Sequence, residues 1–407
     1  MTSSLTPITP NPGGQLTIQE IIGRDKLIDE VWGVLRGQSV YMNDHRRIGK
    51  TQIMVKMHAE PQAGWHTIKR DLESCHTAVD FAACVFQDAS QVLSRKKRML
   101  RSTKALLSQL GGTEVGGILT FPSGTPLPWK NMLEQTFADI EQEMISLEEE
   151  AKFPQRMVFL WDEIPFLLDN ISRRESPDVA MEVLDALRAF SQDHDHIRLV
   201  LTGSIGIHHV LSALRKSGYG NDPLNRMHHI QPGPLAADDA RMLASRLLIG
   251  AGFDSEKINI IECSTVIAAL VGNVAFYIHK LISRLPKKQP LTSEIIEQQL
   301  KAEISSLERN DWNLSHYADR LVKYYGDDVS IVRLILDHVA IKNADANFDS
   351  MRRAVTGSMN FHDDEKLRSL IRLLCQDFYL KREQDGSYRF HLELIRRWWC
   401  VYRELSN

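Results

Sequence analysis

Hydrophobic positions in the first half of the chain switch repeatedly between continuous apolar runs and helical spacing. The apolar, β-rich runs predict strands over residues 39–43, 65–70, 156–161 and 197–202. Apolar residues at helical spacing predict helices over about residues 25–35, 52–58, 77–93, 97–110 and 177–192. Strands that alternate with helices in this way are typical of an α/β fold with a parallel sheet.

A Gly- and Pro-rich piece, residues 111–128, interrupts this alternation. Within it, residues 117–121 predict half of a hairpin, and residues 129–150 predict a long amphipathic helix with an acidic end. We therefore expect an insertion in the sheet-containing core over about residues 95–150.

Four regions are expected along the chain. Residues 1–19, rich in Ser, Thr, Pro and Gly, predict a disordered tail, and residues 20–234 the sheet-containing core. Residues 235–307 contain successive segments with apolar residues at helical spacing, which predict a helical lid. Residues 308–407 continue with helices and end in a hairpin around Asp385-Gly386, which predicts a winged-helix domain.

Composition excludes several classes of protein. The 407 residues exceed what one hydrophobic core usually serves, and the net charge of -3 lacks the global basic field of a nucleic-acid coat protein. No stretch approaches the roughly 20 apolar residues that cross a bilayer, so we expect no membrane partner. The chain has five cysteines: Cys75, Cys84, Cys263, Cys375 and Cys400. They are odd in number and never form a C-x-x-C pair, which argues against a disulfide framework or a zinc site and favours a cytoplasmic location.

The first chemical motif follows the strand at 39–43. Gly49-Lys50-Thr51 stands between that strand and a helix, as at the end of a Walker A loop. There, main-chain N–H groups and the helix N-terminus hold phosphate, Lys50 reaches the β- and γ-phosphates, and Thr51 holds Mg²⁺. The full motif carries its first glycine where this chain has Asp44, which adds a negative charge near polyphosphate.

The second motif ends the strand at 156–161. Asp162 and Glu163 follow it, which predicts one carboxylate that orients Mg²⁺ and one that activates the attacking water. The next strand ends in Thr202-Gly203-Ser204, where the Thr202 hydroxyl can sense the γ-phosphate. The alternatives are a strand that ends in a solvated acidic turn, and Thr202 and Ser204 as simple helix caps.

These motifs resemble the prokaryotic ATPases at the border of the AAA+ and STAND classes, the archaeal-type ATPase family, which is similar to origin-recognition ATPases. The resemblance covers residues 21–284 and rests on Ile22-Gly23-Arg24-Asp25, on Arg46 to Thr51, on Leu160 to Glu163, on Leu201 to Ser204 and on Gly272 to Tyr277. It implies a P-loop NTPase core, a helical lid and a C-terminal winged helix.

The resemblance also implies positions around the nucleotide. Gly23 and Arg24 would lie beside the adenine base, and Arg47 and Gly49 would join Lys50 and Thr51 in holding ATP. Ala275 stands where the family's lid carries a proline near the nucleotide.

Other charged residues give no specific signal. Arg173, Arg174, Arg215 and Arg226 lie in segments where an arginine finger could arise, but a solvated surface role is favoured for each. His208-His209 and His228-His229 are expected to be turn or core residues rather than metal ligands.

The C-terminal region offers basic and aromatic residues: Lys381, Arg382 and Arg389 in the hairpin, and Arg396-Arg397-Trp398-Trp399 after it. They can form a surface for double-stranded DNA, or a protein-facing surface with the Trp pair sealing the core.

The sequence therefore predicts an ATP-binding, Mg²⁺-dependent regulatory ATPase or molecular switch. It would act with a protein partner, through self-association or on DNA, with a defence or mobile-element context among the expectations. Lys50, Glu163 and Thr202 are the predicted catalytic residues, and Thr51 and Asp162 the metal ligands. The alternative is a regulator whose nucleotide site does not hydrolyse ATP, suggested by Asp44 and Ala275.

Overall fold

The computed structural model describes residues 6–93, 113–115, 118–120, 129–203, 207–216, 218, 224–254, 256–287, 289–306 and 310–405. The chain forms two compact units. The sheet unit comprises Asp25–Arg46 and Lys50–Pro232, and the helical unit comprises Met1–Arg24, Arg47–Gly49 and Gly233–Asn407. The expected boundary between core and lid, after residue 234, lies beside the boundary that the structure places at Gly233.

The sheet unit is built on a five-stranded sheet in the order β2-β5-β6-β1-β7, in which all neighbouring strands are parallel. The strands are β1 (Val40–Asn43), β2 (Trp65–Asp71), β5 (Arg156–Asp162), β6 (Ile197–Gly203) and β7 (His228–Ile230). This confirms the α/β class and the parallel sheet. The edge strand β7 was not predicted, because its two exposed histidines leave no apolar run to read.

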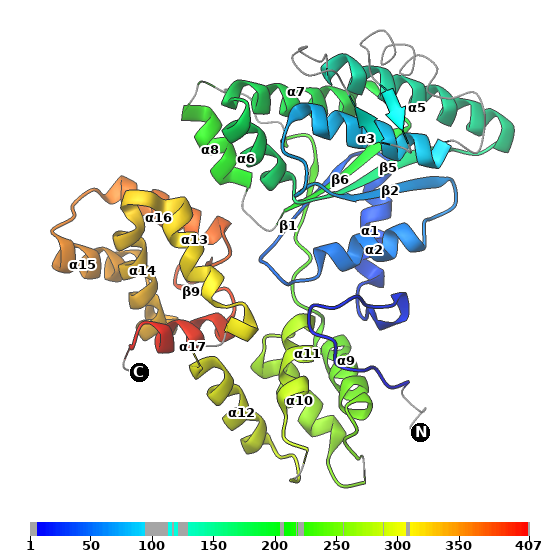
Figure 1. Ribbon diagram of the computed structural model, residues 1–407. Helices are drawn as coiled ribbons and strands as arrows, with labels where there is room; N and C mark the ends of the chain where they lie inside the picture. The colour runs from blue at the N-terminus through cyan, green and yellow to red at the C-terminus, as the bar shows by residue number, and fades with distance from the viewer. Residues whose placement is uncertain are drawn as a thin grey trace. The chain divides into compact units, whose positions relative to one another are not determined.

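Helices cover both faces of this sheet (Figure 1). Successive side chains of β5 point to opposite faces, so Val158 and Leu160 pack on one side while Phe159 and Trp161 pack on the other. The first side is covered by α1 (Asp25–Leu35) and α2 (Lys50–Ala59). The second is covered by α3 (Ala78–Leu93), α5 (Trp129–Ala151), α6 (Ile164–Arg174), α7 (Pro177–Asp193) and α8 (Ile207–Lys216).

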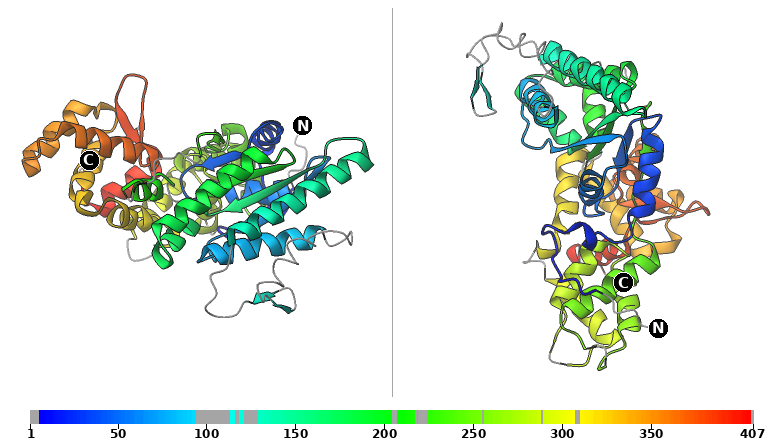
Figure 2. Two further views of the ribbon diagram at one scale, coloured as in Figure 1. Left: turned by 90° about the horizontal axis from the view of Figure 1, so that it is seen from above. Right: turned by 90° about the vertical axis from the view of Figure 1, so that its right-hand side faces the viewer.

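Helix α5 corrects part of the expected insertion over residues 95–150. Its apolar stripe lies in the core of the sheet unit, where the ring of Phe137 stacks on Phe190 of α7 with centroids 4.2 Å apart. α5 is thus a structural layer of the fold (Figure 2) rather than an appendage. The predicted hairpin is present as β3 (Thr113–Val115) paired antiparallel with β4 (Ile118–Thr120). The helix predicted over 97–110 lies outside the described residues.

The helical unit has one continuous apolar core, which runs from the predicted lid into the C-terminal region. Its first part contains α9 (Ala237–Gly250), α10 (Ile260–Leu270), α11 (Ala275–Arg284) and α12 (Ser293–Ser305). Its second part contains α13 (Ser315–Tyr325), α14 (Val329–Lys342), α15 (Phe348–Met359), α16 (Asp364–Gln376), the antiparallel strands β8 (Leu380–Arg382) and β9 (Tyr388–Phe390), and α17 (Glu393–Tyr402). Short 3-10 turns are η1 (Ile18–Glu20), η2 (Asn310–Trp312), η3 (Gly326–Asp328) and η4 (Asn343–Asp345). This is the element order from which the winged-helix domain was predicted.

From residue 6 onward, the N-terminal segment corrects the expectation of a disordered tail over residues 1–19. Ile8 is buried in the helical unit's core, and its main-chain N–H donates to the carbonyl of Arg246 in α9 at 3.0 Å. The Arg246 side chain in turn donates to the carbonyl of Thr6. Composition alone indicated disorder, but the buried Ile8 and hydrogen bonds to the helical unit hold this segment in place.

No helix within the described ranges combines the length and the apolar character that a membrane crossing requires.

Acid should weaken the attachment of the N-terminal segment, because the buried imidazole of His279 accepts a hydrogen bond from the main-chain N–H of Asn11 at 3.2 Å. Burial lowers the pKa of His279 from 6.5 to about 4, so the neutral form stabilises the fold. That stabilisation is present above about pH 6.5 and is lost as pH falls toward 4, by up to about 3 kcal/mol.

The measurement is chemical unfolding of wild type and His279→Gln at several pH values across this window. We expect the wild type to lose more stability on acidification than the variant. The same pH dependence in both proteins would remove His279 as the cause.

Candidate functional site

The carboxyl ends of β5, β6 and β1 bring together segments that are far apart in the sequence. Trp161 pairs with Leu201, and Thr202 pairs with Met42, so the ends of these neighbouring strands meet at one edge of the sheet. Ligand sites of open α/β sheets lie at this edge. The predicted residues Asp162 and Thr202 therefore lie where the loop after β1 begins.

The Asp162 carboxylate connects three of the predicted elements. Its Oδ2 accepts a hydrogen bond from the Thr51 hydroxyl at 2.6 Å, and its Oδ1 accepts one from the Thr202 hydroxyl. The main-chain N–H of Glu163 also donates to Oδ1 at 3.1 Å. Asp162 and Thr202 are buried, so these donors offset the cost of removing a carboxylate from water.

This oxygen cluster fits a magnesium ion. Mg²⁺ prefers hard oxygen donors and binds through one or two carboxylates together with hydroxyl, water and phosphate oxygens. Thr51 is exposed at the start of α2, and its hydroxyl already lies within hydrogen-bonding distance of the carboxylate. The donor set is therefore suitable for the ion that the sequence predicts.

Glu163 occupies an unusual backbone conformation at the turn from β5 into α6. Its φ of 61° and ψ of 39° place it in the left-handed region, which a glutamate adopts at a cost. Its side chain makes no capping hydrogen bond to α6 and is partly exposed. The sharp turn leaves a carboxylate at the same sheet edge as Asp162.

The loop after β1 closes around the ammonium group of Lys50. Nζ donates to the main-chain carbonyls of Asp44 at 2.6 Å and of His45 at 3.0 Å, and the Lys50 side chain is buried. The loop includes two left-handed residues, Arg47 with φ 69° and Gly49 with φ 106°. Glycine adopts this conformation without strain, whereas arginine pays about 1–2 kcal/mol.

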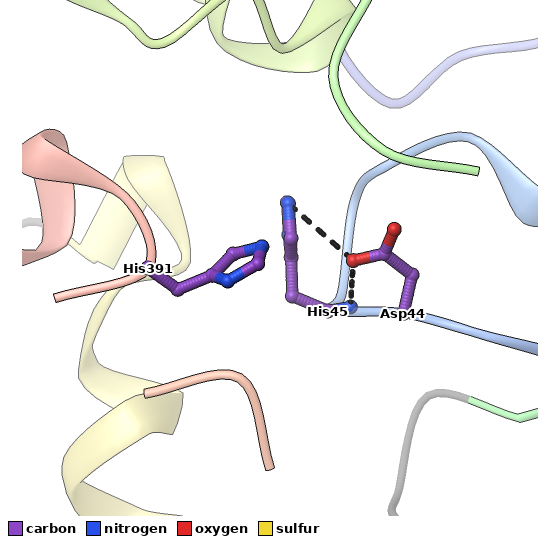
Figure 3. Close-up of side chains that lie close together, drawn as sticks. All are labelled: Asp44, His45 and His391. Atoms are coloured by element: carbon purple, nitrogen blue, oxygen red, sulfur yellow. Dashed lines mark hydrogen bonds and ion pairs between the residues drawn. The ribbon is translucent and has the colours of Figure 1, made fainter. Parts of the chain in front are cut away.

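The Asp44 carboxylate turns back on its own loop (Figure 3). Its Oδ1 accepts a hydrogen bond from the main-chain N–H of His45 at 2.6 Å and lies 3.9 Å from Nε2 of the same residue. Asp44 is only 3% exposed. The carboxylate thus uses a main-chain donor of the type that a phosphate-binding loop offers to its ligand.

Within the helical unit, Arg24 fixes the backbone of the second half of this loop. Its guanidinium donates to the carbonyls of Ile48 at 2.7 Å and Gly233 at 3.0 Å, and the side chain is 5% exposed. Gly23 has φ +69°, and a Cβ there would lie 2.6 Å from Cβ of Asp239 in α9, so only glycine fits. Arg24 therefore contacts the loop directly, whereas Gly23 lies against α9.

Arg47 places its guanidinium over the ring of Phe276, 4.7 Å from the centroid, within the helical unit. Sequence reasoning named the stretch that contains Phe276 but gave the ring no role. The signal available was an aromatic residue at the start of a predicted lid helix, which is too common to interpret alone.

The other candidate charges have ordinary surroundings. Arg173 pairs with Asp169 one helical turn away, and Arg174 and Arg226 are exposed, in keeping with surface roles. The Arg215 side chain is outside the described part of the chain. His228 and His229 lie on β7.

In the C-terminal region, Trp398 and Trp399 are buried, so the interpretation that they seal the core is the one that the structure supports. The neighbouring Arg396 and Arg397 both pair with Glu393.

Comparison with known proteins identifies the fold. No protein-family model and no curated protein matches the chain. Among solved structures, a Walker-type ATPase of Pyrococcus abyssi aligns over 97% of this chain and 98% of its own, with 13% identity and a TM-score of 0.59. The ORC2 protein of Aeropyrum pernix, solved in ADPNP and ADP complexes, aligns over 93% of both chains with 11% identity and a TM-score of 0.49. The first match shows that this chain has a P-loop ATPase fold, which confirms the predicted fold class.

Replacing Thr202 by valine should destabilise the sheet unit. The buried Asp162 Oδ1 would lose its hydroxyl donor while the side-chain volume stays almost the same, at a cost of about 1–3 kcal/mol. Thr202→Ser, which keeps the hydroxyl, is the matched control and should retain most of the stability. Denaturant unfolding of the three proteins measures the difference, and equal losses in both variants would contradict the importance of the hydroxyl.

Proposed function

We propose that this chain binds ATP with Mg²⁺ and hydrolyses it, as a regulatory ATPase or molecular switch. The observation that carries the proposal is the buried Asp162 carboxylate holding the hydroxyls of Thr51 and Thr202 beside the Lys50 loop. A residue set drawn from three sequence-distant segments, in this order at this sheet edge, is that of phosphoryl-transfer sites. The shared fold with a Walker-type ATPase supports the same activity.

In this proposal each residue has one task. Lys50, Gly49 and the N-terminus of α2 bind the β- and γ-phosphates, and Thr51 and Asp162 hold Mg²⁺, which would neutralise charge on the phosphate oxygens. Glu163 accepts a proton from the attacking water, and the Thr202 hydroxyl orients that water or the γ-phosphate. Gly23, Arg24 and Arg47 are assigned to nucleotide binding by the family resemblance, and Arg24 donates to the Ile48 carbonyl within the helical unit.

ATP binding must reorganise the loop. Lys50 Nζ has to leave the carbonyls of Asp44 and His45 before it can reach a phosphate. The exchange of two hydrogen bonds for an ion pair with polyphosphate links nucleotide binding to loop conformation, which is the local event that a switch requires.

The partner in this proposal is a protein or a second copy of the chain, with double-stranded DNA as the alternative. Lys381 pairs with Glu383 at 2.9 Å, and Glu393 pairs with Arg396 and Arg397. These basic groups are already partly neutralised, whereas DNA affinity depends on cations that displace counterions from phosphate. The charge balance favours a protein-facing surface.

A second candidate function is nucleotide binding without turnover. The specific observation behind it is Asp44, whose carboxylate accepts the His45 N–H within the phosphate loop. A regulator of this kind would keep the fold and lose hydrolysis.

Steady-state phosphate release from ATP and Mg²⁺ tests the leading proposal. We expect turnover in the wild type, loss of both binding and turnover in Lys50→Ala, and retained ATP binding with turnover reduced by about 10²–10⁴-fold in Glu163→Gln. Calorimetry on the same proteins separates binding from hydrolysis. Turnover unaffected by Lys50→Ala would contradict the proposal, and tight binding without turnover in the wild type would establish the second candidate.

Asp44→Gly should tighten ATP binding. The change restores the glycine of the motif, removes a negative charge near the phosphates and releases the His45 N–H, an effect of about 1.4 kcal/mol or tenfold in Kd. Asp44→Asn, which removes the charge but keeps a carbonyl acceptor, separates the two contributions. Unchanged affinity in both variants would show that Asp44 does not oppose the nucleotide.

A further inference from the structure

Cys75 and Cys84 form a thiol pair in the sheet unit. Cys75 lies in the turn after β2 and Cys84 on α3, and the Cys75 thiol donates a hydrogen bond to the Cys84 sulfur at 3.5 Å. Both are free thiols; Cys75 is 1% exposed and Cys84 is partly exposed. The Cys84 sulfur is thus accessible to a small reagent, whereas the Cys75 sulfur is buried.

The surroundings favour a thiolate on Cys84. The hydrogen bond from Cys75 lowers the pKa of Cys84 to about 7, assisted by the positive charge of Arg70, although burial and the carboxylates of Asp88 and Asp80 oppose the shift. The same contact and burial raise the pKa of Cys75, so that residue keeps its proton. Two neighbouring thiols therefore have distinct chemical roles, a nucleophile and a resolving thiol.

An ion pair fixes the Arg70 guanidinium, whose positive charge helps to lower the pKa of Cys84. Its guanidinium forms a bidentate ion pair with Asp88, Nε to Oδ2 at 2.5 Å and Nη2 to Oδ1. A charge fixed by two parallel hydrogen bonds retains its position beside the sulfurs.

We infer that Cys75 and Cys84 are a redox-active dithiol that hydrogen peroxide, or another small peroxide, converts to an intramolecular disulfide. The Cys84 thiolate attacks one peroxide oxygen, an S–O bond forms as the O–O bond breaks, and the departing hydroxide takes up a proton to become water. The Cys75 sulfur then attacks the Cys84 sulfenic acid, the S–S bond forms, and the expelled hydroxide leaves with the Cys75 proton as a second water. The two thiols lose two electrons and the peroxide gains them.

The disulfide would act on the strand that carries Asp162. The sulfurs must approach from 3.5 Å to about 2.05 Å, which pulls on the turn at Cys75. In this turn the Cys75 N–H donates to the Leu72 carbonyl, and the Leu72 N–H donates to the Asp162 carbonyl at 3.0 Å. Asn170 on α6 also donates to the Cys75 carbonyl. Oxidation thereby strains the backbone at Asp162.

The test measures the number of free thiols after oxidation and identifies the cysteines that the disulfide joins. Full-length protein is treated with hydrogen peroxide, unfolded and titrated with a thiol reagent, and its peptides are examined by mass spectrometry. The reduced chain has five thiols; we expect the oxidised chain to lose two of them, recovered on adding dithiothreitol, with the bond between Cys75 and Cys84. A disulfide between other cysteines, a disulfide between chains, or no loss of thiols would overturn the inference.

Single variants test the roles. Cys75→Ser should leave the Cys84 sulfenic acid unresolved and trapped by dimedone, whereas Cys84→Ser should react slowly and give no sulfenic acid at Cys75. Cys375→Ser is the matched control: Cys375 is also partly exposed, but burial raises its pKa to about 11, so its removal should change nothing. Sulfenic acid at Cys75 in the Cys84→Ser protein would reverse the assigned roles and overturn them.

The rate of thiol loss should rise with pH through about 7, because only the Cys84 thiolate attacks peroxide. Groups that face the pair are Arg70 on β2 and Asp80 and Asp88 on α3. The Asp80→Asn variant removes an opposing carboxylate and leaves the ion pair between Arg70 and Asp88 intact, so it should raise the rate at pH below 7. A rate that first rises near pH 9, as for an ordinary thiol, would contradict the activated Cys84.

The effect on hydrolysis rests on the proposed function, whereas the thiol count does not. Oxidation should lower ATP turnover in the wild type and in Cys375→Ser, with recovery by dithiothreitol, and should leave Cys84→Ser unaffected. A disulfide that forms without changing turnover would overturn the link to Asp162, and absence of turnover in the reduced protein would instead count against the proposed function.

Discussion

A buried carboxylate organises the sheet unit of this protein. Asp162 has lost most of its contact with water, and burial of an unsatisfied carboxylate is costly, so the fold must bring hydrogen-bond donors to it. The hydroxyls of Thr51 and Thr202 provide them, one from the first turn of α2 and one from β6. These two contacts connect the end of β5 to the first turn of α2 and to the neighbouring strand β6.

The loop itself is held by its own main chain. The Lys50 ammonium group donates hydrogen bonds to the carbonyls of Asp44 and His45. The left-handed conformations of Arg47 and Gly49 bend the backbone between His45 and Lys50. The Arg24 guanidinium donates to the Ile48 carbonyl, and the Ile48 side chain is buried in an apolar core, so polar contacts and apolar packing together set the loop's geometry. The Lys50 hydrogen bonds are themselves charge-assisted, so a phosphate that binds this loop has to compete with two carbonyls for the ammonium group.

The thiol pair lies in the same network. The turn that carries Cys75 is connected through the Leu72 N–H to the carbonyl of Asp162, the residue whose side chain joins α2 to β6. A change of sulfur chemistry at the carboxyl end of β2 therefore reaches the proposed catalytic edge through main-chain hydrogen bonds, which tolerate little change in length or angle. Position in the sheet, rather than proximity in sequence, connects Cys75 to Asp162.

The sequence by itself determined the alternation of strands and helices, the parallel sheet, and Lys50, Thr51, Asp162 and Thr202 as candidates, because apolar periodicity and motif spacing are local properties of the chain. It assigned the N-terminal segment to a disordered tail and placed α5, whose helix it predicted, in an insertion, since composition and sequence position do not report what a side chain such as Ile8 or Phe137 packs against. The tertiary structure alone decided that the Asp44 carboxylate binds the His45 N–H and that Cys75 touches Cys84. These are contacts of a few ångströms between groups whose orientation depends on backbone dihedrals and on the packing of α3 against the sheet, which no linear pattern encodes.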